Sequence, residues 1–256
     1  MYGPSLAGRT LVIADRRGIF YASLQYLQSR YNRADRTVTD ADRPVILDRR
    51  ETERGELVLR RAGEHFEVIA NGTFLMDTRD GRSERALVRE AVAGLHGARI
   101  LLAGLGVGVS LDEALRHEVS EVVVVELEPV VVEWARGPLS GIAGRGLDDP
   151  RVRLVVADLR DVVTRGEAPF DAVCLDVDNG PGWLVHDANA ALYGSEGLAA
   201  MAALLRAGGR LAVWAATADP AFEHRLGAAV GPVAAVSIPV ARGADDVVYV
   251  ARKRAG

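Results

Sequence analysis

The chain has 256 residues, of which 49% are hydrophobic and 26% charged, and its formal net charge is −4. This composition is typical of a globular protein with a large core; the interspersed charges argue against nucleic-acid binding, and the single cysteine, Cys174, excludes disulfides and multi-cysteine metal sites. No apolar run reaches the roughly 18 residues that span a bilayer, and arginines interrupt the N-terminal stretch, so we expect a cytoplasmic protein with neither membrane contact nor signal peptide.

Residues 1–50 are expected to form an N-terminal extension of uncertain structure. Residues 10–14 have the pattern of a short strand and residues 18–31 that of a helix with several aromatic side chains, before a polar, turn-rich stretch. An exposed apolar cluster is more typical of a docking surface than of a catalytic site. This region therefore either packs on the main body or mediates formation of a homodimer, and the sequence leaves both open.

Residues 51–83 are predicted to form a small antiparallel β-domain. Short period-two runs at 56–60, 65–70 and 73–76 are separated by turns, and Asn71-Gly72 is the strongest short hairpin signal. Ser83 is predicted to cap the helix that follows.

Residues 84–256 are predicted to form an α/β domain in which short apolar runs alternate with helices. The predicted strands are 100–103, 122–125, 152–156, 170–175, 210–214, 234–238 and 247–251. The predicted helices include 128–134, 188–205 and 220–230. Such alternation predicts a mostly parallel seven-stranded sheet with helices on both faces, that is, a Rossmann-like architecture.

The most informative motif is a glycine-rich turn after the strand 100–103. Gly104, Gly106 and Gly108 let the backbone bend sharply and approach a ligand where a Cβ would collide, and the next helix offers its free N–H groups. A dinucleotide fingerprint needs glycine where this chain has Val109, so a nucleoside without phosphates fits better. The alternative is a purely structural turn.

Acidic residues stand at the ends of three predicted strands. Glu126, Asp158 and Asp176 each follow an apolar run directly or within two residues. Ligands of parallel sheets bind outside the carboxyl ends of the strands, so we expect these acids to lie beside the glycine turn. Glu126 is placed to accept hydrogen bonds from ribose hydroxyls, whereas Asp158 could equally cap a helix.

These residues resemble the spermidine synthase family, the aminopropyltransferases built on the class I S-adenosylmethionine-dependent methyltransferase fold, over about residues 56–215. The resemblance is carried by the glycine-rich motif 100–117, the strand end Val125-Glu126-Leu127-Glu128, the pair Ala157-Asp158 and the loop from Asp176 to Pro181. It implies an adenosyl sulfonium donor, either S-adenosylmethionine or its decarboxylated form. The residues that it places at this donor are Gly104, Leu105, Gly106, Val107, Gly108, Glu126, Leu127, Asp158 and Leu159.

The resemblance also implies residues at the reacting end of the site. Asp176 would be the catalytic acid and Asp178 a second catalytic residue that binds the acceptor amine, although the family places two residues between its aspartates and this chain has one. Tyr193 matches an aromatic residue of the family and would line the acceptor pocket or pack in the core. Trp183 is expected to cover the acceptor or to pack, and His186 is expected at the surface, with a role as base as the alternative.

Two departures from the family bear on the substrate. Spermidine synthases have an aspartate in the glycine loop that holds the aminopropyl ammonium, and the matching residue here is Val107. Residues that help to hold the polyamine in the family are matched here by Leu75 and by Glu84-Arg85-Ala86. The resemblance therefore gives a diamine pocket little support.

Either donor is attacked in line at a carbon next to sulfur, so the enzyme mainly positions the two partners and excludes water, without a metal. Because Val107 is neutral, it favours the α-carboxylate of full S-adenosylmethionine, and the sequence favours methyl transfer to a small acceptor, an amine among the candidates. The first alternative is aminopropyl transfer in polyamine biosynthesis, as in spermidine synthase. The second is a nucleoside-binding protein without turnover.

Overall fold

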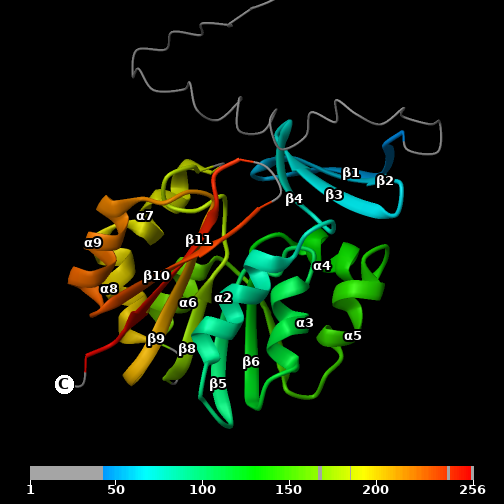
Figure 1. The fold of residues 1–256 in the computed structure, drawn as a ribbon. Helices are drawn as coiled ribbons and strands as arrows, with labels where there is room; N and C mark the ends of the chain where they lie inside the picture. Colours follow the sequence, from blue (N-terminus) through cyan, green and yellow to red (C-terminus); the bar gives the residue numbers. More distant parts are fainter. Residues whose placement is uncertain (1–42, 167–168, 185, 241–242, 255–256) are drawn as a thin grey trace, which may run out of the picture.

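The computed structural model describes residues 43–166, 169–184, 186–240 and 243–254. Two sheets make up this part of the chain: a small antiparallel sheet, and a larger one covered by helices (Figure 1). The strand and helix expected at 10–14 and 18–31 lie outside the described residues. Within the described ranges, no helix combines the length and apolarity needed to cross a membrane.

The small sheet has four antiparallel strands in sequence order. They are β1 (Val45–Thr52), β2 (Gly55–Ala62), β3 (His65–Ala70) and β4 (Thr73–Asp77). The last three are the predicted hairpin strands, and Asn71 and Gly72 both have positive φ, as a tight hairpin turn of this type needs. Strand β1 was not predicted, because most of its residues are exposed and its second half is charged, which leaves no apolar alternation to detect.

The large sheet has seven strands in the order β10-β11-β9-β8-β5-β6-β7. They are β5 (Ala98–Ala103), β6 (Val119–Glu126), β7 (Val152–Val156), β8 (Phe170–Leu175), β9 (Leu205–Ala215), β10 (Val233–Ile238) and β11 (Asp246–Arg252). Strand β11 pairs antiparallel with both of its neighbours, and every other pair is parallel. The predicted Rossmann-like fold with a preceding small β-domain is confirmed.

Helices cover both faces of this sheet, and alternate strand residues serve the two layers. In β5, Ile100 and Leu102 pack in one cluster with side chains of the first layer, while Leu101 and Ala103 pack with those of the second. The first layer consists of α2 (Arg82–Val92), α3 (Val109–Leu115) and α4 (Pro129–Arg136), followed by η2 (Ser140–Gly144) and α5 (Arg145–Leu147). The second consists of α6 (Leu159–Arg165), α7 (Ala190–Tyr193), α8 (Ser195–Ala203) and α9 (Pro220–Ala229), with η3 (Asp187–Asn189) before α7. Burial on both faces explains why the parallel strands read as continuous apolar runs.

Two predicted helix features are wrong. Ser83 lies inside α2, whose N-cap is Gly81, and its buried hydroxyl donates to Asp246 Oδ2 over 2.6 Å instead of capping the helix. The predicted helix 188–205 is broken at Gly194, which has an extended backbone, and α8 ends at Ala203. The break lets α7 and α8 cross closely: a Cβ on Gly197 would lie 2.2 Å from the Ala191 carbonyl oxygen.

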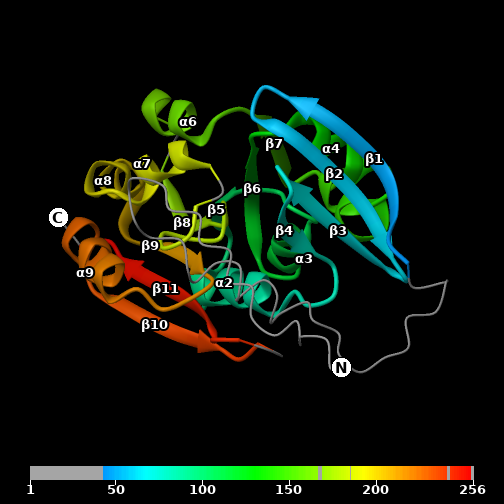
Figure 2. The same ribbon diagram turned by 90° about the horizontal axis from the view of Figure 1, so that it is seen from above.

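The small sheet is fastened to α4 by polar contacts from β1 and the turn after it. Trp134 donates its indole N–H to Asp48 over 2.9 Å, and Arg50 forms a 3.3 Å ion pair with Glu133. Both views show this sheet beside α4, above one edge of the main sheet (Figures 1 and 2). These contacts hold the small sheet over that edge of the main sheet.

Candidate active site

The carboxyl ends of the parallel strands and the small sheet enclose a cavity of about 370 Å³. Its position outside these strand ends is where Rossmann-like folds bind ligands, and its volume suits a small molecule. The carboxylates among the described residues that line it are Asp77, Asp80, Glu84, Glu126, Glu128, Asp158, Asp176, Asp178 and Asp246. Leu57, Phe74, Leu75 and Met76 of the small sheet supply an apolar part of the wall.

The glycine turn forms one wall of the cavity, as predicted, with one exception. Gly104 has φ +100°, and a Cβ there would lie 2.3 Å from the Asp176 carbonyl oxygen, so glycine is needed for the turn to pack on the end of β8. Gly108, predicted to contact the donor, does not line the cavity. A Cβ on Gly108 would lie 2.2 Å from the Ala143 Cβ, so its role is to pack against η2.

Glu126 is held rigidly at the end of β6. Its Oε2 accepts the Leu105 N–H over 2.9 Å and its Oε1 accepts the Glu128 N–H over 2.8 Å. Burial raises the pKa of Glu126, and these N–H donors partly oppose that effect. The side chain thus ties the glycine turn to the start of α4 and lines the cavity between them.

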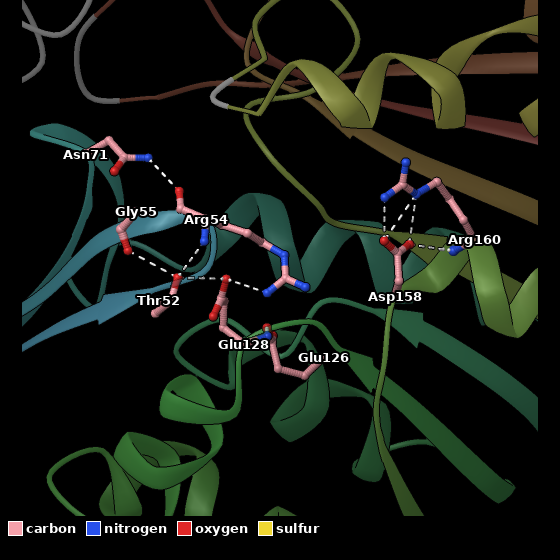
Figure 3. A network of polar contacts seen from close by, with 8 residues as sticks. All are labelled: Thr52, Arg54, Gly55, Asn71, Glu126, Glu128, Asp158 and Arg160. Carbon is pink, nitrogen blue, oxygen red and sulfur yellow. Dashed lines mark hydrogen bonds and ion pairs between the residues drawn. The ribbon is translucent and has the colours of Figure 1, made fainter.

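Glu128 carries the contacts between this strand end and the small sheet (Figure 3). Its Oε1 accepts from Arg54 Nη1 over 3.1 Å and from Thr52 Oγ1 over 3.4 Å. Its Oε2 is buried and has no hydrogen-bond partner among the described residues. Glu128 belongs to the motif Val125-Glu126-Leu127-Glu128 quoted above, but no role was predicted for it.

Asp158 is the N-cap of α6, the alternative role expected for it, and it also lines the cavity. It accepts the Arg160 N–H over 2.8 Å, and its two carboxylate oxygens are bound by the Arg160 guanidinium (Figure 3). The Arg160 side chain holds the pKa of Asp158 below its ordinary value. A ligand amine that bonds Asp158 would therefore share or displace this guanidinium.

Three acids meet at the other part of the cavity. Burial raises the pKa of Asp176 to about 6, and the charge of Asp246 adds to this, while the Ser110 hydroxyl, 3.1 Å away, opposes it. Burial, followed by the charges of Asp176 and Asp246, raises the pKa of Glu84 to about 8. Asp246 is 2% exposed and accepts from the Ser83 hydroxyl, and from Trp214 Nε1 over 3.4 Å. The charge of Asp246 thus disfavours ionisation of both Asp176 and Glu84, and the charge of Asp176 disfavours ionisation of Glu84, which is the electrostatic condition that a bound cation relieves.

The loop after β8 is shaped by Asp178, a non-glycine residue with φ +62°. Its Oδ2 accepts from the His186 N–H over 3.1 Å and from Asn189 Nδ2 over 2.9 Å. Left-handed backbone at such a residue is costly and is found where the surroundings enforce it, often at functional sites. The Asp178 carboxylate lines the cavity and at the same time folds its own loop.

Of the aromatic residues predicted near the acceptor, Trp183 lines the cavity and Tyr193 does not. Tyr193 is 3% exposed, packs edge-on against Phe222 in the core and donates its hydroxyl to the Val177 carbonyl over 2.5 Å. Tyr193 therefore supports the loop after β8 from the core side. His186, expected at the surface, also lines the cavity.

The acids Glu84 and Asp246 were not predicted as site residues, for different reasons. Glu84 has no local signal beyond its place in the family pattern. Asp246 stands at the start of its strand, whereas acids that bind ligands of a parallel sheet are expected at strand ends. Because β11 runs antiparallel to β9, with Val247 paired to Ala215, its first residue lies at the same edge as the carboxyl ends of the parallel strands. Within the described part of the chain, no group of three or more His, Cys, Asp or Glu side chains could hold a metal ion.

A family model described as the spermine/spermidine synthase domain matches residues 88–226. This match covers more than half of the chain, and the chain belongs to that family. The resemblance inferred from the motifs is thereby confirmed.

Curated relatives share part of the sequence. A polyamine aminopropyltransferase of Korarchaeum cryptofilum is 35% identical over 111 residues, 43% of this chain and 33% of that protein. The Mycobacterium tuberculosis (H37Rv) protein of the same name is 35% identical over 140 residues, 52% of this chain and 26% of that protein. The Yersinia pestis (Pestoides F) protein of the same name is 30% identical over 143 residues, which are 54% of this chain and 48% of that protein. The matched segment spans less than half the length of each of these relatives.

Solved structures share the fold. Spermidine synthase from Thermotoga maritima superposes with a TM-score of 0.68 and 19% identity, over 82% of this chain and 74% of that one. A spermidine synthase in complex with the transition-state analogue AdoDATO gives a TM-score of 0.67 and 18% identity, over 82% and 73%. At this identity, the likeness concerns the fold.

Proposed function

We propose that the protein transfers an aminopropyl group from decarboxylated S-adenosylmethionine to an amine acceptor. Family membership and the names of the curated relatives favour this over methyl transfer, which the sequence favoured and which the comparisons do not support. The observation that carries the proposal is the group of Glu84, Asp176 and Asp246 in the cavity. This group of carboxyl side chains would bind a positively charged part of the donor or acceptor.

The preference for full S-adenosylmethionine depended on the neutral residue Val107. Val107 is 3% exposed and packs in the hydrophobic core, while Asp246 brings negative charge to Asp176 from β11. Glu84 of α2 adds a carboxyl group with a pKa of about 8, which a cation bound beside it would help to ionise. An α-carboxylate near these acids would be repelled, whereas an ammonium would be stabilised. The charge that the family carries in the glycine loop is supplied here from other elements, and the neutrality of Val107 no longer favours methyl transfer.

Different residues along the cavity bind different parts of the donor. Glu126 accepts hydroxyl hydrogen bonds from the ribose, and Asp158 accepts from the adenine amine. Two buried polar atoms without a partner among the described residues, Glu128 Oε2 and Asn179 Nδ2, belong to cavity-lining residues and fit a polar ligand.

Asp176 orients the acceptor amine and takes its proton. The lone pair of the neutral amine forms the new N–C bond to the aminopropyl carbon next to sulfur, and the C–S bond breaks with its electron pair on sulfur. The leaving product is 5′-methylthioadenosine, and the proton passes from nitrogen to the Asp176 carboxylate. A pKa of about 6 leaves this carboxylate ionised at neutral pH, yet basic enough to accept a proton.

Mass spectrometry of reactions with each sulfonium donor and a panel of monoamines and diamines tests the proposal. We expect a product that has gained an aminopropyl group. Asp176→Asn should lower turnover by about 10²-fold or more while nucleoside affinity stays within a few-fold. Asp112→Asn, on the exposed part of α3, is the matched control and should keep full activity.

A product that gains a methyl group would replace this proposal with methyl transfer. Nucleoside binding without transfer from either donor would instead support a binding protein without turnover.

A further inference from the structure

Glu128 is buried, and only one of its two carboxylate oxygens accepts a hydrogen bond from the described residues. It is 8% exposed and lines the cavity two residues after Glu126, whose Oε1 accepts its N–H. It occupies the N-cap position of α4, yet its side chain accepts no N–H of that helix. Oε1 is bound by Arg54 and Thr52, while Oε2 has no partner among the described residues. A buried carboxylate oxygen without a hydrogen-bond donor lowers the stability of the folded protein, and a bound ligand that donates to it removes this cost.

We propose that Glu128 is a second ribose-binding carboxylate, which accepts a hydrogen bond from one hydroxyl of the donor's ribose while Glu126 accepts from the other. The inference rests on the proposed function, because it requires an adenosyl donor in this cavity. It adds a residue to the site and assigns a role to the small sheet, which supplies the two groups that hold Glu128.

The chemistry of the pair fits a vicinal diol. Two hydroxyls offer two donors, and two neighbouring carboxylates offer acceptors. These are Oε2 of Glu128 and, on Glu126, the lone pairs that the backbone N–H groups of Leu105, Leu127 and Glu128 leave unused. A phosphate at the same place would be repelled by both acids. The Arg54 guanidinium, 3.1 Å from Glu128, offsets the repulsion between the two carboxylates.

The groups that orient Glu128 come from a firmly held turn between β1 and β2 (Figure 3). Asn71 Nδ2 donates to the Arg54 carbonyl over 3.1 Å, and Asn71 Oδ1 accepts the Glu56 N–H over 2.9 Å. Arg54 is therefore a positioning residue that acts through Glu128, and the turn is part of the nucleoside site.

Calorimetry with 5′-methylthioadenosine and its 2′-deoxy and 3′-deoxy analogues tests the inference on the full-length protein. In the unmutated protein, each missing hydroxyl should weaken binding about tenfold or more, as for hydrogen bonds to a charged group. In Glu128→Met, the analogue that lacks the hydroxyl bound by Glu128 should bind within about threefold of 5′-methylthioadenosine. The other analogue should still bind about tenfold or more weakly, because Glu126 still accepts, in the parent nucleoside, from the hydroxyl that this analogue lacks. Glu118→Met, at an exposed carboxylate just before β6, should behave like the unmutated protein.

Arg54 provides a second measurement. Arg54→Met should weaken nucleoside binding, Arg54→Lys should recover part of it, and Arg54→Met should add little in the Glu128→Met background. Thermal unfolding checks that each variant is folded, and Glu128→Gln replaces Glu128→Met if the latter is not.

Unchanged sensitivity to both hydroxyls in the Glu128 variant would overturn the inference and leave aminopropyl transfer standing. Absence of nucleoside binding to the unmutated protein would overturn the proposed function, and the inference with it.

Discussion

Neutralising Glu84 should stabilise the protein without ligand at alkaline pH. The pKa of Glu84 is raised from 4.5 to about 8, first by burial and then by the charges of Asp176 and Asp246. Between these two pH values the folded protein holds a proton that the unfolded chain has lost, so the free energy of unfolding falls as pH rises through this window. Glu84→Gln removes this pH-dependent loss of stability, because glutamine does not ionise.

The size of the effect follows from the shift. A rise from 4.5 to about 8 is worth at most roughly 5 kcal/mol at about 1.4 kcal/mol for each pKa unit. Glu84 faces a cavity and is partly exposed, so solvent screening reduces this figure. We expect Glu84→Gln to be more stable than the unmutated protein by about 1–2 kcal/mol at pH 9, and about equal to it at pH 5.

Urea unfolding at several pH values between 5 and 9 measures this difference. Glu90→Gln, an exposed position on the same helix, is the matched control and should follow the unmutated protein at every pH. Parallel pH curves for Glu84→Gln and the unmutated protein would refute the reasoning, because they would mean that Glu84 ionises normally in the folded state.

Three further predictions concern the glycine turn, the core side chain behind the loop after β8, and the proposed proton acceptor. Gly104→Ala should lower the free energy of unfolding by more than about 1 kcal/mol and reduce activity, because its φ is +100° and the new Cβ would displace the Asp176 carbonyl; urea unfolding and kinetics measure both. Tyr193→Phe should cost about 1–2 kcal/mol in the same unfolding assay, since it leaves the Val177 carbonyl without its hydroxyl donor; an unchanged midpoint would contradict this role. The pH profile of kcat/KM should rise through about pH 6 as Asp176 ionises, and a profile flat between pH 5 and 7 would exclude Asp176 as the proton acceptor.

The positions of the glycine turn and of the acids at the parallel strand ends were predictable because their signals are local in the sequence. Three glycines after a buried strand indicate a turn, and an acid after a run of valines indicates a strand end, so the amino-acid sequence alone suffices to place Gly104, Glu126 and Asp176. The same local reasoning left the place of Tyr193 open, because a core aromatic and a pocket aromatic share one pattern. It assigned Gly108 to the donor, whereas this glycine packs against η2 and does not line the cavity.

What the sequence determined by itself is the alternation of strands and helices and the acids at the parallel strand ends, since periodicity and turn chemistry act over a few residues. Only the tertiary structure decided that Glu84 and Asp246 lie beside Asp176, and that Glu128 is linked to the small sheet. Ser83 and Asp246 are 163 residues apart and Arg54 and Glu128 are 74 residues apart, so no local pattern relates them. The antiparallel direction of β11 and the docking of the β1–β2 turn, both set by packing of the whole chain, bring these side chains to one cavity.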